Sequence, residues 1–215
     1  MNVFGEGAEA KLYECTFAGA TALRKVRGRK KYRVYSLDTR LRAMRTRREA
    51  KILHAAKMAG VRCPLLFHAD LRQFEIIEEY LPDAALLRQK LGELPSQKQE
   101  KLMRECGGML GRLHLAGIVH GDFTTSNVML GADGKIFFID FGLADFSQSE
   151  EERAIDLLLF KKSVSASQFG AFLAGYSGCE KGAKKAVARL AEVLLRGRYV
   201  ARQGADGGKN GAADA

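Results

Sequence analysis

Two short motifs in the second half of the chain constrain its fold more than any other feature. His120-Gly121-Asp122 opens a polar loop that ends at Asn127, and Asp140-Phe141-Gly142 directly follows the apolar run 136–139. Such a loop holds a carboxylate and an amide on one tight segment, and a strand delivers a second carboxylate beside it. Turn-forming Asp and Asn residues could explain each piece alone. The combination, in this order, predicts one polar site between a helix and a strand pair.

Phosphoryl transfer is the chemistry that requires these groups. One carboxylate must accept a proton from the attacking hydroxyl or water, or orient it. A second carboxylate and an amide oxygen must hold the metal ions that neutralise phosphate charge. We therefore predict Asp122 as the catalytic residue, and Asn127 with Asp140 as metal ligands.

The first half of the chain contains groups that could hold a nucleotide. A glycine-rich turn at residues 5–10 lies between strand-like runs, where absent side chains let backbone N–H groups approach phosphates. Lys25 lies in the third strand-like run, and Glu49 lies in a predicted helix from which it could hold that lysine. The connector 78–83 would meet the edge of the base. The predicted nucleotide-binding residues are Gly5, Gly7, Ala8, Glu9, Lys25, Glu49, Glu78 and Tyr80.

Apolar periodicity predicts an α+β fold. A spacing of three to four residues predicts a long helix over 38–59, with Asp38 as its N-cap and Gly60 as its stop. The predicted strands are 10–17, 22–26, 65–69, 74–77, 128–130 and 136–139. The other predicted helices are 96–114, 151–164, 166–175 and 182–196.

A change of pattern near residue 80 divides the chain into two expected lobes of one domain. Residues 1–79 are rich in strands and residues 80–202 are mostly helical, so we expect a ligand-binding cleft between them. Residues 203–215 contain no core-forming side chain and are expected to be disordered. The N-terminus is acidic and no apolar run could span a membrane, so we expect a soluble, cytoplasmic chain with no membrane partner.

The positive charge is concentrated in two blocks. The formal net charge of the 215 residues is +10, but residues 24–48 contain twelve basic side chains and one acid. A second block, 184–202, contains six basic side chains and one acid. This distribution indicates either a polyanionic partner or a solvated helix face. If the partner is nucleic acid, the candidate contacts are Arg42, Arg45, Arg196 and Arg198.

Taken together, these motifs resemble those of the protein-kinase-like superfamily. Within it the chain is most similar to the small atypical kinases of the PRPK family, the kinase-like subunit of the KEOPS complex. The resemblance spans residues 4–202 and rests on 7–10, Lys25, Glu49, 46–50, 120–122, 124–127, 139–143, 155–157 and 195–198. It implies a minimal protein-kinase-like fold, with a small β-rich N-terminal lobe, one long helix and a reduced helical C-terminal lobe.

The resemblance also implies a function. It predicts an atypical Ser/Thr kinase and ATPase that uses ATP and Mg²⁺ and supports the threonylcarbamoyladenosine (t6A) modification of tRNA. Asn127 and Asp140 would hold magnesium, and Lys25 with Glu49 would hold the phosphates. The implied partners are the sugar-kinase-like ATPase and threonylcarbamoyltransferase subunit, a small helical KEOPS subunit and tRNA.

Departures from conventional kinases indicate the type of activity. Only 13 residues separate Gly142 from Asp156, Gly121 replaces an Arg that pairs with a phosphorylated activation loop, and Thr124 replaces a phosphate-neutralising Lys. These changes favour ATP hydrolysis or autophosphorylation over broad protein kinase activity. The alternatives are a phosphotransferase for a sugar or an aminoglycoside-type antibiotic, and a non-catalytic scaffold that binds tRNA.

Overall fold

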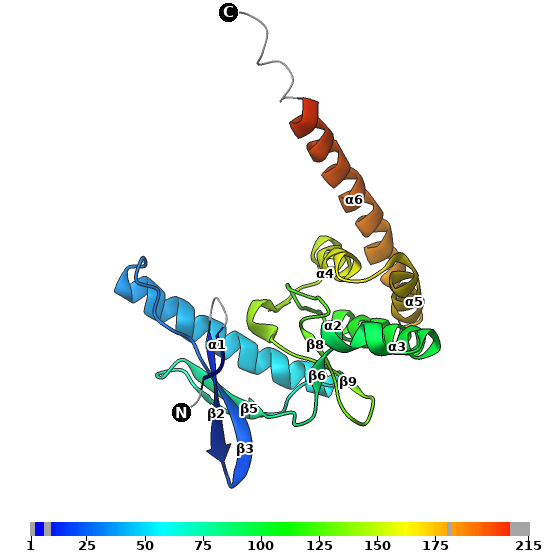
Figure 1. The fold of residues 1–215 in the computed structure, drawn as a ribbon. Helices are drawn as coiled ribbons and strands as arrows, with labels where there is room; N and C mark the ends of the chain where they lie inside the picture. Colours follow the sequence, from blue (N-terminus) through cyan, green and yellow to red (C-terminus); the bar gives the residue numbers. More distant parts are fainter. Residues whose placement is uncertain (1–2, 7–9, 180–181, 207–215) are drawn as a thin grey trace, which may run out of the picture.

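The first part of the chain forms an antiparallel sheet crossed by one long helix. The computed structural model describes residues 3–6, 10–179 and 182–206. Five strands pair in the order β1-β2-β3-β5-β4. They are β1 (Val3–Glu6), β2 (Lys11–Phe17), β3 (Ala20–Val26), β4 (Leu66–Asp70) and β5 (Glu75–Glu79). Helix α1 (Tyr35–Met58) lies against this sheet (Figure 1) and buries Ile52, Leu53 and Ala56 in the core.

Helix α1 begins earlier than the sequence pattern predicted. Its N-cap position is Val34, and Asp38 lies inside the first turns, fully buried. The Asp38 carboxylate accepts a hydrogen bond from the Lys30 backbone N–H at 3.2 Å and pairs with Arg42 Nε at 2.8 Å. The N-cap prediction is therefore wrong, because Asp38 ties the preceding loop to the helix. The predicted stop is confirmed: the helix ends at Met58, and Gly60 has a φ of +73°.

The second part is mainly helical. Its helices are α2 (Leu87–Lys90), η1 (Leu91–Glu93), α3 (Ser96–Leu115), η2 (Phe141–Leu143), α4 (Glu150–Lys162), α5 (Ala166–Ser177) and α6 (Ala183–Asp206). Its short strands are β6 (Ala85–Leu86), β7 (Ile118–Val119), β8 (Val128–Leu130), β9 (Ile136–Phe138) and β10 (Asp145–Phe146). Strands β6, β8 and β9 form a small sheet, and β7 pairs with β10. Among the described residues, one continuous apolar core joins α1 to these helices.

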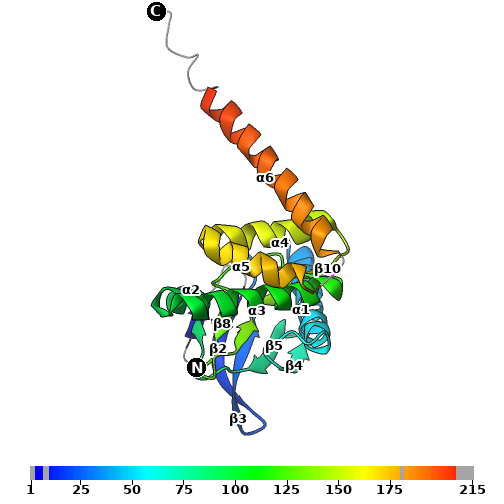
Figure 2. The same ribbon diagram turned by 90° about the vertical axis from the view of Figure 1, so that its right-hand side faces the viewer.

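Helix α6 projects from the body of the molecule (Figures 1 and 2). Ala183, Ala186 and Leu190 near its start are buried, and α6 packs mainly on α4. The helix continues past Arg202 to Asp206, so the first residues of the expected disordered tail are helical. Residues 207–215 lie outside the described residues. No helix in the described ranges is both long enough and apolar enough to cross a membrane.

Candidate active site

An aromatic cluster fixes the loop that carries Asp122. The loop runs from β7 to β8, and the ring of Phe123, within the loop, is fully buried in the core. The Phe123 ring centroid lies 4.7 Å from that of Phe138 and 5.1 Å from that of Phe160. Aromatic rings at such separations attract one another beyond the gain from simple burial. The side chain next to Asp122 therefore holds the backbone of the loop in place.

Asp156 of α4 holds the same loop through its backbone. Its buried carboxylate accepts hydrogen bonds from the N–H groups of His120 at 2.7 Å and Gly121 at 2.8 Å. Gly121 has a φ of +77°, and a Cβ atom at this position would lie 2.5 Å from the Leu143 carbonyl oxygen. Only glycine fits such a position. The loop therefore turns sharply just before Asp122 and passes close to the segment that follows Asp140.

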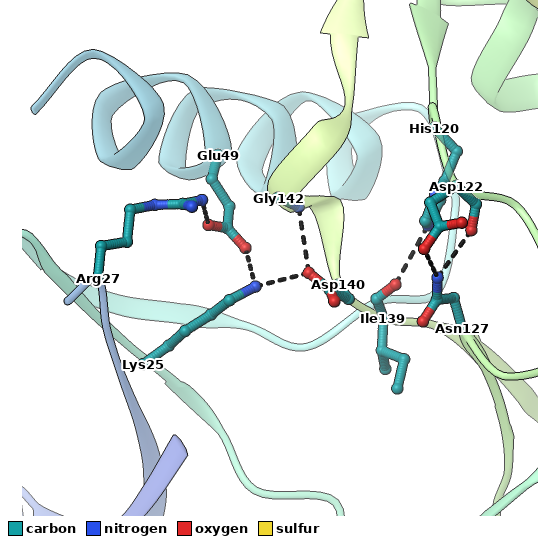
Figure 3. Close-up of polar contacts among 9 residues, drawn as sticks. All are labelled: Lys25, Arg27, Glu49, His120, Asp122, Asn127, Ile139, Asp140 and Gly142. Atoms are coloured by element: carbon teal, nitrogen blue, oxygen red, sulfur yellow. Dashed lines mark hydrogen bonds and ion pairs between the residues drawn. The ribbon is translucent and has the colours of Figure 1, made fainter. Parts of the chain in front are cut away.

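Asp122 and Asn127 contact each other across the loop. The Asn127 amide nitrogen donates hydrogen bonds to the Asp122 backbone oxygen at 2.7 Å and to the Asp122 carboxylate at 2.9 Å (Figure 3). This arrangement uses the nitrogen of the amide and leaves its oxygen for another ligand. The sequence-predicted pair thus lies on one rigid turn.

Asp140 occupies an unusual backbone conformation beside Lys25. Its φ of 58° lies in the left-handed region, which few residues other than glycine adopt, and such conformations cluster at functional sites. One carboxylate oxygen accepts hydrogen bonds from Lys25 Nζ at 2.7 Å and from Gly142 N–H at 3.3 Å. Burial opposes ionisation, but the positive charge of Lys25 outweighs it and lowers the pKa of Asp140 below its usual value.

Lys25 is held by two carboxylates. Its ammonium nitrogen lies 2.5 Å from Glu49 Oε1 and 2.7 Å from Asp140 Oδ1. Burial alone would lower the pKa of Lys25, but the carboxylates of Glu49, Asp140 and Glu78 raise it above its usual value. Lys25 is therefore charged across the physiological pH range. Strand β3, helix α1 and the end of β9 meet at this one ammonium group (Figure 3).

Arg27 is a member of this cluster that the sequence analysis missed. Its buried guanidinium pairs with Glu49 Oε2, so the Glu49 carboxylate binds one cation on each oxygen. Arg27 lies one residue past the end of β3 and two residues after Lys25, and its backbone N–H donates to the Phe74 carbonyl oxygen at 3.0 Å. The extended pairing therefore continues to Arg27, and alternate residues of extended backbone share a face. That spacing was the available signal, but the many basic neighbours in the 24–48 block obscured it.

His120 supports the site rather than facing it. Its Nε2 lies 3.1 Å from the Ile139 carbonyl oxygen, just before Asp140. Burial lowers the pKa of His120, so the ring is neutral near pH 7 and its Nε2 donates to that oxygen. This bond connects the loop that carries Asp122 to the strand end that carries Asp140.

A cavity of about 690 Å³ joins these groups. Lys25, Asp122, Asn127 and Asp140 form the polar end of its lining. Tyr80 also lines it and follows β5, which runs away from the level of Lys25, paired with Ile76, past Glu78. Glu78 and the apolar side chains of Ala10, Leu12, Leu23, Met129 and Ile139 line the cavity between them. Of the predicted glycine-rich turn, Gly5 lies in β1, whereas Gly7, Ala8 and Glu9 lie outside the described residues. The cavity has the dimensions and the polarity of a nucleotide site.

The oxygens at the polar end fit a divalent metal ion. Asp140 is half exposed, and only one of its carboxylate oxygens is bound to Lys25 and Gly142. The amide oxygen of Asn127 faces away from its bonds to Asp122 (Figure 3). Carboxylate and amide oxygens are the ligands that hard cations such as Mg²⁺ prefer.

The four arginines predicted to contact nucleic acid have different surroundings. Arg42 is occupied within the fold, because it pairs with Asp38 and its guanidinium lies 3.9 Å above the Phe74 ring. Arg45 lies half buried on α1. Arg196 is exposed and lies 3.5 Å from Glu151, and the side chain of Arg198 lies outside the described residues. The exposed face of α1 instead carries Arg40, Arg47 and Lys51, which the sequence analysis did not select.

Comparisons with known proteins agree with this geometry. The chain matches the protein kinase domain over residues 1–171. It is 38% identical over 214 residues to the KEOPS complex subunit Bud32 of Pyrococcus abyssi, with 93% of this chain and 96% of the relative covered. It is 36% identical over 210 residues to a probable serine/threonine-protein kinase BUD32 homolog of Archaeoglobus fulgidus, with 94% and 98% covered.

A second group of relatives is much longer. The probable bifunctional tRNA threonylcarbamoyladenosine biosynthesis protein of Methanothermobacter thermautotrophicus is 35% identical over 209 residues. The match covers 92% of this chain and 36% of that relative. This chain therefore corresponds to about a third of such a bifunctional protein.

Proposed function

The chain contains a protein kinase domain and belongs to the Bud32 family. From this we propose that it is an atypical Ser/Thr kinase and ATPase of a KEOPS complex, which supports t6A modification of tRNA. Membership of the kinase domain implies ATP and a divalent metal ion, for which we propose Mg²⁺. Lys25, held between Glu49 and Asp140 in the same cavity as Asp122 and Asn127, is the observation that carries this proposal.

Each polar residue of the cavity has a role in this proposal. The Asp122 carboxylate orients the attacking hydroxyl or water and accepts its proton. Asn127 and Asp140 hold Mg²⁺ through their oxygens, and the metal neutralises phosphate charge. Lys25 contacts the phosphates and Glu49 positions it, while Tyr80 and the backbone near it meet the base. The lobes 1–79 and 80–202 would provide the two walls of the cleft.

Hydrolysis fits this site better than phosphorylation of a protein substrate. From Gly142 the chain reaches α4 at Glu150 through β10, which pairs with β7. This short connection leaves little backbone on which a protein substrate could dock. Water, or a hydroxyl group within the complex, is then the natural acceptor of the phosphoryl group.

The proposed partners follow from the relatives and from charge. The bifunctional relatives join a segment like this chain to a longer polypeptide, which supports a direct contact with the sugar-kinase-like ATPase and threonylcarbamoyltransferase subunit. We also propose a small helical KEOPS subunit as a partner. For tRNA we propose contacts from Arg45, Arg196 and Arg198 together with the exposed Arg47 and Lys51. Arg42 is not included, because Asp38 already occupies it.

The test is the steady-state rate of ATP hydrolysis of the chain alone, with the partner ATPase subunit, and with partner and tRNA. Lys25→Ala and Asp140→Ala should each abolish hydrolysis under all three conditions. Lys135→Ala and Asp133→Ala are matched controls, because these residues form an exposed ion pair at 2.7 Å and do not line the cavity. An undiminished rate of ATP hydrolysis in Lys25→Ala or Asp140→Ala would overturn the catalytic assignment. Stimulation by a small alcohol but not by the partner subunit would favour a small-molecule phosphotransferase.

A further inference from the structure

A carboxyl group lies inside the cavity where an apolar wall would be expected. Glu78 of β5 pairs directly with Leu23 of β3, and Lys25 pairs with Ile76. Paired residues share a face of the sheet, as do alternate residues along one strand. Glu78 therefore projects from the same face as Leu23 and Lys25, and all three line the cavity. It lies between the phosphate end and the connector at Tyr80.

The backbone of Glu78 is paired in the sheet, but its side-chain carboxyl has no hydrogen-bond or ion-pair partner among the residues that the structure describes. Its neighbour Glu79, in contrast, accepts a hydrogen bond from the Leu65 N–H at 3.0 Å. The charged groups that face Glu78 are Lys25 from β3, Glu49 from α1 and Asp140 after β9. Burial raises the pKa of Glu78 to about 7, with Lys25 opposing the shift. Glu78 is only half-buried, and because it lines the cavity a bound ligand could provide a hydrogen-bond donor to its carboxyl.

A purine base provides or withholds that donor according to its identity. The apolar side chains of Leu12, Leu23 and Met129 form walls between which a flat ring can stack. A base held there with its phosphates at Lys25 presents one edge to the end of β5. Adenine carries an amino group, a donor, at the ring position where guanine carries a carbonyl oxygen, an acceptor.

We propose that Glu78 determines the base selectivity of the nucleotide site, by accepting a hydrogen bond from the exocyclic amino group of adenine and repelling the carbonyl oxygen of guanine. This role rests on the proposed use of ATP and adds the residue that selects it. Sites built to hydrogen-bond one group can reject an analogue that leaves them unpaired by about 10⁴-fold. For one carboxylate we expect a preference for ATP over GTP of about 10- to 100-fold.

The experiment measures the dissociation constants of ATP, GTP and a purine nucleoside triphosphate without a 6-substituent, by calorimetry at pH 8. Glu78→Gln is nearly isosteric, and its amide can donate to the guanine oxygen, so the ATP preference should fall to within about threefold of unity. The unsubstituted purine should bind the wild type more weakly than ATP. Glu14→Gln is the control, because Glu14 lies in the same cross-strand row but is exposed.

The possible outcomes separate this inference from the proposed function. Wild-type selectivity retained in Glu78→Gln, or equal binding of ATP and GTP by the wild type, overturns the role of Glu78 and leaves the kinase assignment intact. Failure of the wild type to bind any triphosphate overturns both. If Glu78→Gln does not fold, Glu78→Leu serves instead and should weaken ATP binding without weakening GTP binding. Loss of both in Glu78→Leu would contradict the inference.

Discussion

Arg27 pairs with the carboxylate oxygen of Glu49 that Lys25 leaves unoccupied. Lys25 lies in β3, Arg27 follows it by two residues just past the end of that strand, and Glu49 is buried between them on α1. When phosphates attract Lys25, Glu49 therefore still has a fixed partner that keeps its carboxylate paired. We infer that Arg27 is a positioning residue for the Lys25–Glu49 pair.

Arg27→Met should lower kcat/KM for ATP hydrolysis about 10- to 100-fold, which corresponds to the loss of one charged hydrogen bond of about 1.5–3 kcal/mol. Arg27→Lys should recover part of the loss, since it restores the charge. Arg24→Met is the control, because Arg24 lies on the opposite face of β3 and pairs with Glu75. Wild-type kinetics in Arg27→Met would show that Lys25 alone suffices to hold Glu49.

Gly121→Ala should destabilise the protein by more than the free energy that alanine loses in adopting a left-handed backbone conformation. Gly121 and Gly134 have nearly the same φ, +77° and +78°, but only at Gly121 would a Cβ atom meet another atom, the Leu143 carbonyl oxygen at 2.5 Å. The left-handed conformation costs alanine about 1–2 kcal/mol at either position. Thermal unfolding of both variants should therefore give a clearly larger fall in Tm for Gly121→Ala. Equal falls would mean that the loop relaxes without cost.

The free energy of unfolding of the nucleotide-free protein should depend on pH in a way that reflects the raised pKa of Glu78. Its pKa is raised from 4.5 to about 7, so the folded state binds the proton more tightly than the unfolded state does. This group therefore makes no unfavourable contribution below pH 4.5, and stability is lost as the pH rises from there through 7. Urea unfolding at pH 5, 6, 7 and 8 should show Glu78→Gln gaining on the wild type by on the order of 1–3 kcal/mol across this window. A constant difference between the two proteins would contradict the raised pKa.

Binding of tRNA should depend on the exposed face of α1 and on salt. Arg47→Gln with Lys51→Gln should weaken association and lower the slope of log K against log salt by about one for each lost phosphate contact. Lys98→Gln with Lys101→Gln removes the same charge from the exposed surface of α3 and is the matched control. Association is measured by filter binding at several salt concentrations. Equal effects of the two pairs of substitutions would show that α1 contributes only through the net charge of the protein and not through contacts of its own.

The parts of the site that were predictable from sequence are those whose geometry is local. Asp122 and Asn127 lie on one loop, so their spacing already implies their contact, and Asp140 follows a strand directly. Lys25 and Glu49 required the further assumption of a strand packed against a helix, which β3 and α1 satisfy. The catalytic and binding roles of these residues remain predictions that the proposed experiments test.

The residues that were missed or misread depend on contacts distant in sequence. Asp38 matches the pattern of an N-cap, but the segment before it folds back and buries it against Arg42. Arg42 was selected for its charge, which its partner already neutralises. Arg27 could not be told apart from eleven other basic residues without knowing which strand face meets α1. Local patterns give the type of an element, whereas the partner of a side chain is decided by the tertiary fold.

The segment from Gly142 to Glu150 is held in one conformation by several contacts. Strand β10 pairs with β7, Arg48 of α1 pairs with Asp145, and the Ser149 side chain caps α4. These contacts fix a segment of only a few residues at several points. The segment therefore cannot change between an open and a closed conformation without breaking several of them. Any control over the timing of turnover must then come from what assembles around the chain, so the complex itself would act as the switch.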